Sequence, residues 1–243
     1  LIPPTVMNTS VAAREGFEPP ESFPSVAFKA TAIGRSATSP EHSTVVDGTS
    51  VTHMRLHGTV SSDLPLLVVA LEEEATHLHV HELPILVTGA GKVNAAVALS
   101  TRLGAESPRL VVNLGTAGAL RDGISGIHEI ATVTQHDLDD AALHELTGLH
   151  FGAPVELSSE GITLTTGDYF VTDPQIRTRL AEHAHVVDME GYAVARACAA
   201  ANVPVRLIKQ ISDSADGDAS RSWVETVDWC AEQLGAWVHR NLL

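Results

Sequence analysis

The feature that most restricts the fold of this chain is a series of short apolar segments that begins at Asp63. Residues 65–71, 83–89 and 109–115 are apolar almost without interruption, and residues 91–104 have a helical pattern that ends at glycine. Strands without polar alternation are typical of parallel sheets that helices cover on both faces. The sequence therefore predicts a single α/β domain with a central, mostly parallel or mixed sheet flanked by helices.

The second half of the chain continues this alternation. Further strands are predicted at 127–135, 161–170, 185–187 and 203–212. Helical patterns follow at 173–183, after an Asp-Pro start, and at 191–201, which is rich in small residues. The last segment has the spacing of an amphipathic helix packed on a sheet, with apolar residues at Trp223, Val227, Cys230, Leu234, Val238 and Leu242.

Residues 1–61 differ from the rest of the chain in composition. They are rich in Pro, Ser, Thr and Ala and show neither strand nor helix periodicity. Part of this stretch also resembles translated non-coding sequence beside bacterial genes. We therefore expect residues 1–61 to be a poorly ordered or non-native N-terminal extension, and residues 62–243 to form the folded domain.

Charge and cysteine content narrow the class of protein. The net charge is −15, which disfavours binding to nucleic acid. Cys198 and Cys230 lie within helical patterns, which fits free thiols in a reducing cytoplasm rather than disulfides or a zinc site. No apolar run reaches the ~18 residues of a membrane span. We therefore expect a cytoplasmic protein that binds neither nucleic acid nor membrane.

Polar residues gather where the predicted strands end. In open α/β sheets, ligands bind beyond the carboxyl ends of the strands. Carboxylates, a glycine-rich turn, an aromatic residue and a methionine occupy these ends, at 72–74, 115–118, 167–170, 188–190 and 212–213. We expect them to form one site.

The same stretches carry a family resemblance. ALEEE, NLGTAGAL, TGDYFV, VVDMEGYAVARAC and IKQISDSAD occur in an order similar to that of the 5′-methylthioadenosine/S-adenosylhomocysteine nucleosidases, of the nucleoside phosphorylase/hydrolase superfamily. The resemblance runs from about Leu66 to the C-terminus. It implies a nucleoside phosphorylase-like fold for residues 62–243, a purine nucleoside as small-molecule partner, no cofactor and a homodimer. The implied reaction is hydrolysis of 5′-methylthioadenosine, S-adenosylhomocysteine or 5′-deoxyadenosine to adenine and a 5-substituted ribose.

The resemblance assigns two catalytic carboxylates. Hydrolysis of an N-glycosidic bond needs an activated water and a proton on the departing base. Glu74 matches the general base of the family, although three consecutive glutamates also suit a helix start, the reading we keep for Glu72 and Glu73. Asp213 matches the aspartate that protonates purine N7, and a helix N-cap is its alternative role.

Further residues match the binding surface for the nucleoside. Glu190 matches the acceptor for the ribose 2′- and 3′-hydroxyls, Met189 matches the methionine under the ribose, and Asp188 stands beside them in a supporting place. A core methionine and a helix-start glutamate are the alternatives. Phe170 matches the aromatic residue that stacks on the purine, with Val171 beside it for backbone contacts, and core packing is the alternative for Phe170.

The remaining matches are Thr116, Ala117 and Gly118, in the turn that wraps the ribose, and Ser212, which would orient Asp213. Lys209 stands where many members have arginine, and because it interrupts an apolar alternation we expect it to point into the site. The segment after Glu74 is shorter than usual for the family, which leaves the 5′ substituent open. It contains alternate histidines, at 77, 79 and 81, which we expect on a solvated edge rather than at a metal.

Several other functions compete with this hydrolysis. Phosphorylases of the superfamily have a phosphate-binding loop after the first strand, where this chain has three glutamates that would repel phosphate. A futalosine or aminofutalosine hydrolase, an AMP nucleosidase and a purine nucleoside phosphorylase stay as alternatives, and only Lys209 is a good candidate for a 5′-phosphate. A binding protein without chemistry is disfavoured because Glu74, Glu190 and Asp213 occur together.

Overall fold

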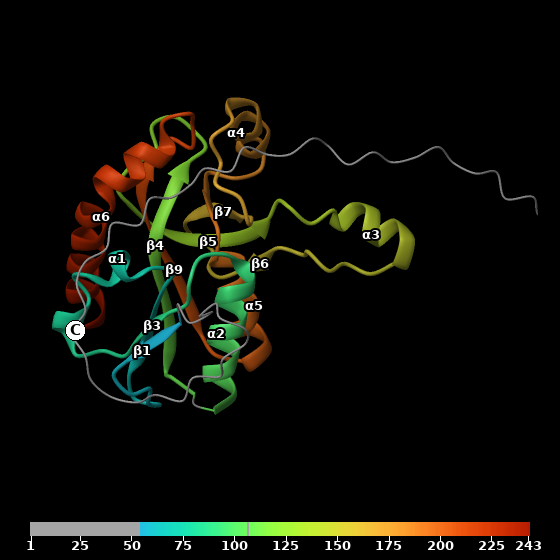
Figure 1. Cartoon of the computed structure of the whole chain (residues 1–243). Helices are drawn as coiled ribbons and strands as arrows, with labels where there is room; N and C mark the ends of the chain where they lie inside the picture. The colour runs from blue at the N-terminus through green and yellow to red at the C-terminus, as the bar shows by residue number, and fades with distance from the viewer. Residues whose placement is uncertain (1–53, 106) are drawn as a thin grey trace, which may run out of the picture. The chain divides into compact units, whose positions relative to one another are not determined.

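The computed structural model describes residues 54–105 and 107–243, and in this part of the chain nine strands form one mixed sheet (Figure 1). The strands are β1 (Arg55–His57), β2 (Pro65–Val69), β3 (Ile85–Val87), β4 (Leu110–Ala119), β5 (Ile127–Gln135), β6 (Val155–Glu156), β7 (Ile162–Thr166), β8 (Val186–Asp188) and β9 (Val205–Asp213). Their order is β1-β3-β2-β4-β8-β7-β5-β6, and β9 pairs with both β4 and β5.

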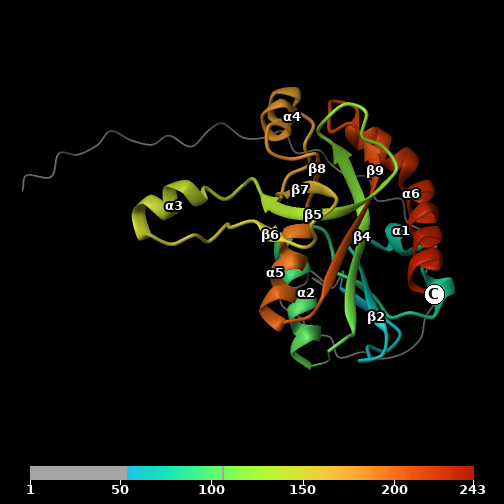
Figure 2. The same cartoon turned by 180° about the vertical axis from the view of Figure 1, so that it is seen from behind.

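Helices cover both faces of this sheet, as the sequence predicts (Figures 1 and 2). They are α1 (Glu72–Ala75), the 3₁₀ helix η1 (His79–His81), α2 (Lys92–Ala105), α3 (Asp140–Thr147), α4 (Pro174–Ala181), α5 (Gly191–Ala201) and α6 (Ala219–Leu242). None of the helices in the described ranges is long and apolar enough to cross a membrane.

The burial of strand β2 explains why its sequence lacks polar alternation. All five of its residues are buried. Leu66 and Val68 pack in the cluster that α2 and α5 cover, whereas Leu67 and Val69 pack in the cluster that α1 and α6 cover. A strand with an apolar layer on each side needs apolar residues at every position.

The central pair of strands, β4 and β9, runs parallel and carries two parts of the site side by side. Gly115 pairs with Lys209, and Ala117 pairs with Ile211. The register then shifts, so that Gly118 pairs with Asp213. This bulge re-aims the end of β9, a common use of bulges beside functional sites.

The structure corrects the expected glycine-rich turn at 115–118, because β4 continues through it to Ala119. The glycines serve close packing instead. A Cβ atom on Gly118 would lie 2.8 Å from Oδ1 of Asp213, and one on Gly115 would lie 3.2 Å from Nζ of Lys209. Side chains at these two positions would occupy the space of the site residues.

The structure differs from the prediction in two further regions. Strand β1 lies within the range 1–61 that we assigned to an extension, yet it pairs antiparallel with β3, so the folded domain begins before residue 62. Residues 1–53 lie outside the described residues. Helix α3 and strand β6 were not predicted, and α3 projects away from the sheet in both views (Figures 1 and 2).

Candidate active site

Glu74 is held at the junction of β2 and α1. Its Oε2 atom accepts hydrogen bonds from the backbone N–H groups of Ala70 (3.1 Å) and Leu71 (3.3 Å). Its Oε1 atom accepts from the backbone N–H (2.9 Å) and the hydroxyl (3.1 Å) of Thr116 on β4. The side chain is 4 % exposed. Four donors therefore fix the orientation of a buried carboxylate at the sheet edge.

Trp223 extends this network from α6. Its indole Nε1–H donates to the hydroxyl oxygen of Thr116 at 2.9 Å. Because the hydroxyl has one proton, this contact leaves that proton free for Glu74. From the sequence, Trp223 was predicted only as part of the apolar face of the last helix. Its bond to Thr116 was not predicted, because a hydrogen bond across more than a hundred residues leaves no local sequence signal.

Asp188, the last residue of β8, and Lys209, in the middle of β9, form a buried ion pair. Nζ of Lys209 lies 2.9 Å from Oδ2 of Asp188, and both side chains are almost fully buried. Asp188 also accepts hydrogen bonds from the hydroxyl of Thr166 (2.6 Å) and the backbone N–H of Gly191 (2.8 Å). Burial lowers the pKa of Lys209, but the nearby carboxylates of Asp188 and Glu190 outweigh burial, and the net pKa is raised. The ammonium group of Lys209 thus lies among the carboxylates of Asp188 and Glu190, with its charge already paired.

Glu190 follows Asp188 at the start of α5 and is 9 % exposed. Its Oε1 atom accepts a hydrogen bond of 2.6 Å from the backbone N–H of Gly91, at the start of α2. Burial first, and then the negative charge of Asp188, raise the pKa of Glu190 to about 8. Gly91 has φ +94°, which favours glycine, so a special backbone position brings α2 to this carboxylate. The sequence analysis did not single out Gly91, although its place in a Gly-Ala-Gly stretch was a usable signal.

A cavity of about 240 Å³ lies beside Gly91, whose backbone N–H donates to Glu190. Its walls are the start of α2, Met189 and the loop after β7, namely Ala90, Gly91, Val93, Asn94, Asp168 and Met189. The Asp168 carboxylate accepts a hydrogen bond of 2.7 Å from the backbone N–H of Lys92, which ties that loop to α2. The predicted methionine therefore lines an open space next to a buried carboxylate.

Asp213 ends β9 in a mostly buried place. The hydroxyl of Ser212 donates to its Oδ2 atom (2.7 Å), and the backbone N–H of Ala215 donates to its Oδ1 atom (2.8 Å). Burial raises the pKa of the Asp213 carboxyl above its usual value, against the opposing effect of these two hydrogen bonds. The alternative role as a helix N-cap is wrong, because α6 begins at Ala219 and Asp218 is its N-cap.

The loop after β7 is divided between core and surface. Val171 is buried, and it packs in one cluster with Val187 of β8 and with Ala215, which follows β9. Phe170 is 43 % exposed, so core packing does not account for it. The structure therefore brings together Glu74, Thr116, Asp188, Glu190 and Lys209 and keeps Phe170 outside this buried cluster.

Comparison with known proteins identifies relatives of this chain. Residues 127–240 match the Phosphorylase superfamily. A relative from Bacillus cytotoxicus, named 5′-methylthioadenosine/S-adenosylhomocysteine nucleosidase, is 32 % identical in an alignment of 177 residues that covers 62 % of this chain and 76 % of the relative. A relative of the same name from Bacillus thuringiensis is 31 % identical over an alignment of the same extent.

Solved structures share the fold. A mutant of the Helicobacter pylori enzyme with 5′-methylthioadenosine in its active site has a TM-score of 0.65 and 22 % identity, over 73 % of this chain and 96 % of that one. Futalosine hydrolase of Helicobacter pylori also has a TM-score of 0.65, with 21 % identity over the same shares. Together the matches define an N-glycosyl hydrolase of the purine nucleosidase class. The chain belongs to the 5′-methylthioadenosine/S-adenosylhomocysteine nucleosidase family.

Proposed function

We propose that this enzyme hydrolyses the N-glycosidic bond of 5′-methylthioadenosine, S-adenosylhomocysteine or 5′-deoxyadenosine, releasing adenine and a 5-substituted ribose. The observation that carries the proposal is the placement of three mostly buried carboxylates against β4 and Lys209. Glu74 accepts hydrogen bonds from Thr116, Asp213 lies against Gly118 on the same strand, and Glu190 shares the neighbourhood of Lys209 with Glu74. Each has different partners, and the reaction needs three different tasks: activation of water, binding of the ribose and protonation of the base.

Glu74 is the general base in this proposal. It removes a proton from water as the water oxygen bonds to C1′ and the C1′–N9 bond breaks. Thr116 and Trp223 position Glu74, because their hydrogen bonds hold one carboxylate oxygen in place. Ala117 and Gly118 continue β4 along the side of the site where the ribose binds, and the absence of a side chain at Gly118 leaves room for Asp213.

Asp213 supplies the proton for N7 of adenine. Its raised pKa keeps a proton on the carboxyl closer to neutral pH than on an ordinary aspartate. Ser212 orients the group through its hydroxyl. A purine stacked on Phe170 would cover apolar surface that is now exposed, and the backbone of Val171 lies beside it for contacts to the base.

Glu190 and Met189 bind the ribose. Hydroxyl donors at C2′ and C3′ favour the ionised form of Glu190, so binding of the sugar lowers the pKa that burial has raised. Met189 offers a polarizable surface in the cavity wall. The ion pair of Asp188 with Lys209 fixes the end of β8, which Met189 and Glu190 follow directly.

The same pair argues against AMP as substrate. A 5′-phosphate needs a cation with free hydrogen-bonding capacity, whereas Lys209 is buried and bound to Asp188. Futalosine is the alternative that the fold leaves open, because the two Helicobacter pylori enzymes have the same TM-score against this chain.

The deciding experiment follows release of free base from a substrate panel by purified enzyme, with and without phosphate. The panel contains the three adenine nucleosides, futalosine, AMP and inosine. We expect release from the adenine nucleosides at a rate that phosphate does not change. If futalosine is cleaved in preference to the adenine nucleosides, the proposed substrate is wrong. If a ribose 1-phosphate forms, the reaction is phosphorolysis and the proposed hydrolysis is wrong.

We also propose that residues 54–243 contain everything that catalysis needs. Strand β1 pairs with β3, so a functional deletion must stop before Arg55. Removal of residues 1–53 should leave kcat/KM and the melting temperature unchanged, because that segment carries no site motif. Removal of residues 1–60 also takes away β1, and it should lower the melting temperature. A large loss of activity on removing 1–53 would contradict the proposal.

We propose a homodimer and a cytoplasmic location as well. Val93 and Val97, one turn apart on α2, are 71 % and 54 % exposed, which suits a surface that a second copy covers. Both cysteines are free thiols, which suits a reducing compartment. Light scattering after size exclusion checks the first point, and cell fractionation checks the second. A monomer at micromolar concentration would contradict the dimer.

A further inference from the structure

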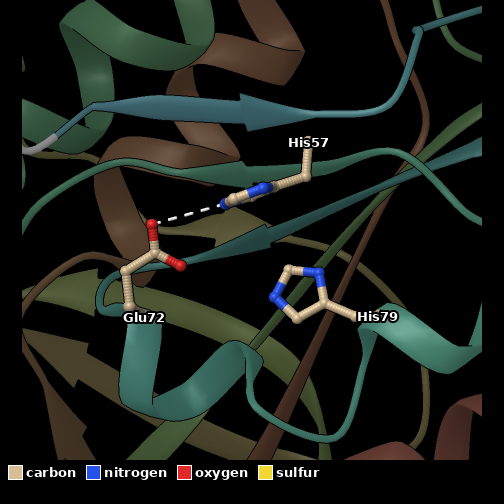
Figure 3. A group of neighbouring side chains, drawn as sticks. All are labelled: His57, Glu72 and His79. Atoms are coloured by element: carbon tan, nitrogen blue, oxygen red, sulfur yellow. Dashed lines mark hydrogen bonds and ion pairs between the residues drawn. The ribbon is translucent and has the colours of Figure 1, made fainter. Parts of the chain in front are cut away.

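Three side chains outside the active site converge on one point (Figure 3). His57 comes from β1, Glu72 from the start of α1 and His79 from the start of η1. One nitrogen of each histidine and one carboxylate oxygen all lie within 4.8 Å of one another. The two rings meet edge to face, with centroids 4.8 Å apart. No task of the proposed hydrolysis uses these residues.

We propose that His57, Glu72 and His79 bind a divalent transition metal ion of the zinc type. Two imidazole nitrogens and a carboxylate oxygen are a donor set that such ions prefer, whereas Mg²⁺ and Ca²⁺ prefer oxygen alone. With zinc–ligand bonds of about 2.0–2.1 Å in tetrahedral geometry, neighbouring ligand atoms lie about 3.4 Å apart. Nε2 of His57 and Oε1 of Glu72 lie 3.3 Å apart. A water molecule completes the fourth position.

The surroundings of the cluster allow an ion to enter. The side chains of His57 and Glu72 are 37 % and 40 % exposed, and His79 is exposed. Arg55 places a guanidinium nitrogen 3.6 Å from the same Glu72 oxygen that faces His57. This cation competes with a metal for the carboxylate, and its exposed side chain can move away into water.

A metal at this place would tie three segments of the chain together. Strand β1 is at the edge of the sheet, η1 belongs to the segment that leads into β3, and α1 carries Glu74 two residues after Glu72. The ion would thus stabilise the element that positions Glu74 without touching the substrate. We expect a structural ion that raises stability, in contrast to a metal that takes part in the reaction.

From the sequence we expected no metal at the three histidines of the 77–81 segment, because no pattern of carboxylate partners follows them. The structure separates them. His77 pairs with Asp228 (3.2 Å), and His81 faces the backbone oxygen of Gly235 (3.0 Å). Only His79 joins the cluster, and its partner His57 comes from a segment that we had assigned to the extension.

The test is calorimetric titration of the chelator-treated full chain with Zn²⁺ alone. We expect one saturable site that becomes at least tenfold weaker in His57→Ala, His79→Ala and Glu72→Gln. His77→Ala is the matched control, because it removes a neighbouring histidine that also faces a carboxylate, and it should bind like the wild type. Arg55→Ala should bind more tightly. Absence of saturable binding by the wild type, or binding by His57→Ala and His79→Ala as tight as that of the wild type, would overturn the site.

A second measurement guards against variants that fail to fold. Zn²⁺ should raise the melting temperature of the wild type and of His77→Ala, but not that of His79→Ala. Because His79 is exposed, its replacement leaves the core untouched. An equal rise in His79→Ala would show that the ion binds elsewhere and would refute the proposal.

Discussion

Glu74 and Glu190 are both buried carboxylates at the edge of the same sheet, but the protein uses their oxygens to different extents. Glu74 accepts four hydrogen bonds, from Ala70, Leu71 and Thr116. In the described part of the chain, Glu190 accepts one, from Gly91, and has Asp188 as a neighbour that raises its pKa. A carboxylate can accept about four hydrogen bonds, so Glu190 has acceptor capacity left for a ligand.

This difference indicates a division of tasks. A general base must stand in the right place before the substrate arrives, and Glu74 has the partners for that. A residue that binds ribose must exchange its present environment for the ligand's hydroxyl groups. The raised pKa of Glu190 reflects an environment that the ligand is expected to improve. By burial alone, Glu74 and Glu190 could not be told apart.

The substitution Glu74→Gln removes the charge of the fixed carboxylate and should have the largest effect. We expect kcat to fall ~10²–10⁴-fold, as is typical for loss of a general base, with the Kd for nucleoside nearly unchanged. Steady-state kinetics and calorimetric binding measure the two quantities. Glu73→Gln is the control, because Glu73 is an exposed residue of the same helix. If Glu74→Gln keeps normal turnover while Glu190→Gln loses kcat at constant KM, the two tasks are reversed.

Asp213→Asn should give the next largest effect. It tests protonation of the base without changing Glu74 or Glu190. An amide cannot release a proton to N7, so turnover of 5′-methylthioadenosine should fall strongly. Preference for adenine over inosine analogues, ~1–3 kcal/mol or about one to two decades in the wild type, should disappear. Ratios of kcat/KM for the two substrates in both proteins measure this. An adenine preference kept by Asp213→Asn would rule out the role, and Asp218→Asn serves as the exposed control.

The sequence predicted those parts of the fold that apolar runs define. The bounds of β5 were predicted at 127–135 and found there, and the buried β2 was recognised from its continuous apolar residues. The expected turn at 115–118 was wrong, because glycine signals both turns and close packing. Helix α3 was missed because it has only 8 residues, too few for a sustained apolar period, and none of them is buried.

The candidate site was predictable only as a set of residues at strand ends. Family resemblance supplied Glu74, Glu190 and Asp213, but their partners depend on tertiary contacts. The bond from Trp223 to Thr116 and the contact of Gly91 with Glu190 join residues distant in sequence. Local patterns carry no information about such pairs, so the sequence could not distinguish the fixed carboxylate from the adaptable one.

The raised pKa of Glu190 should make the stability of the protein depend on pH. Its pKa of about 8 in the folded protein lies above its ordinary value of 4.5, so the folded protein keeps the proton to a higher pH than the unfolded chain. The free energy of unfolding therefore decreases as pH rises between these two values and levels off above pH 8. Glu190→Gln lacks this dependence, so its melting temperature relative to wild type should increase from pH 5 to 8.

Bound nucleoside should reverse that trend in the wild type, because ribose hydroxyl groups favour the ionised carboxylate. Affinity should increase towards pH 8 in wild type, whereas it should be flat in Glu190→Gln. Calorimetric titration at several pH values measures it. An identical pH profile in both proteins would show that the glutamate is not the ribose acceptor.

The smallest expected effect comes from Trp223→Phe, which tests whether Glu74 depends on its positioning. The change removes the indole N–H that donates to Thr116, while the hydroxyl can still donate to Glu74. Loss of one hydrogen bond costs ~0.5–1.5 kcal/mol, so kcat should fall about 2- to 10-fold with KM unchanged. Trp229→Phe, at an exposed position of the same helix, should have no effect. If KM rises and kcat stays constant in Trp223→Phe, the tryptophan supports substrate binding and Glu74 needs no such support.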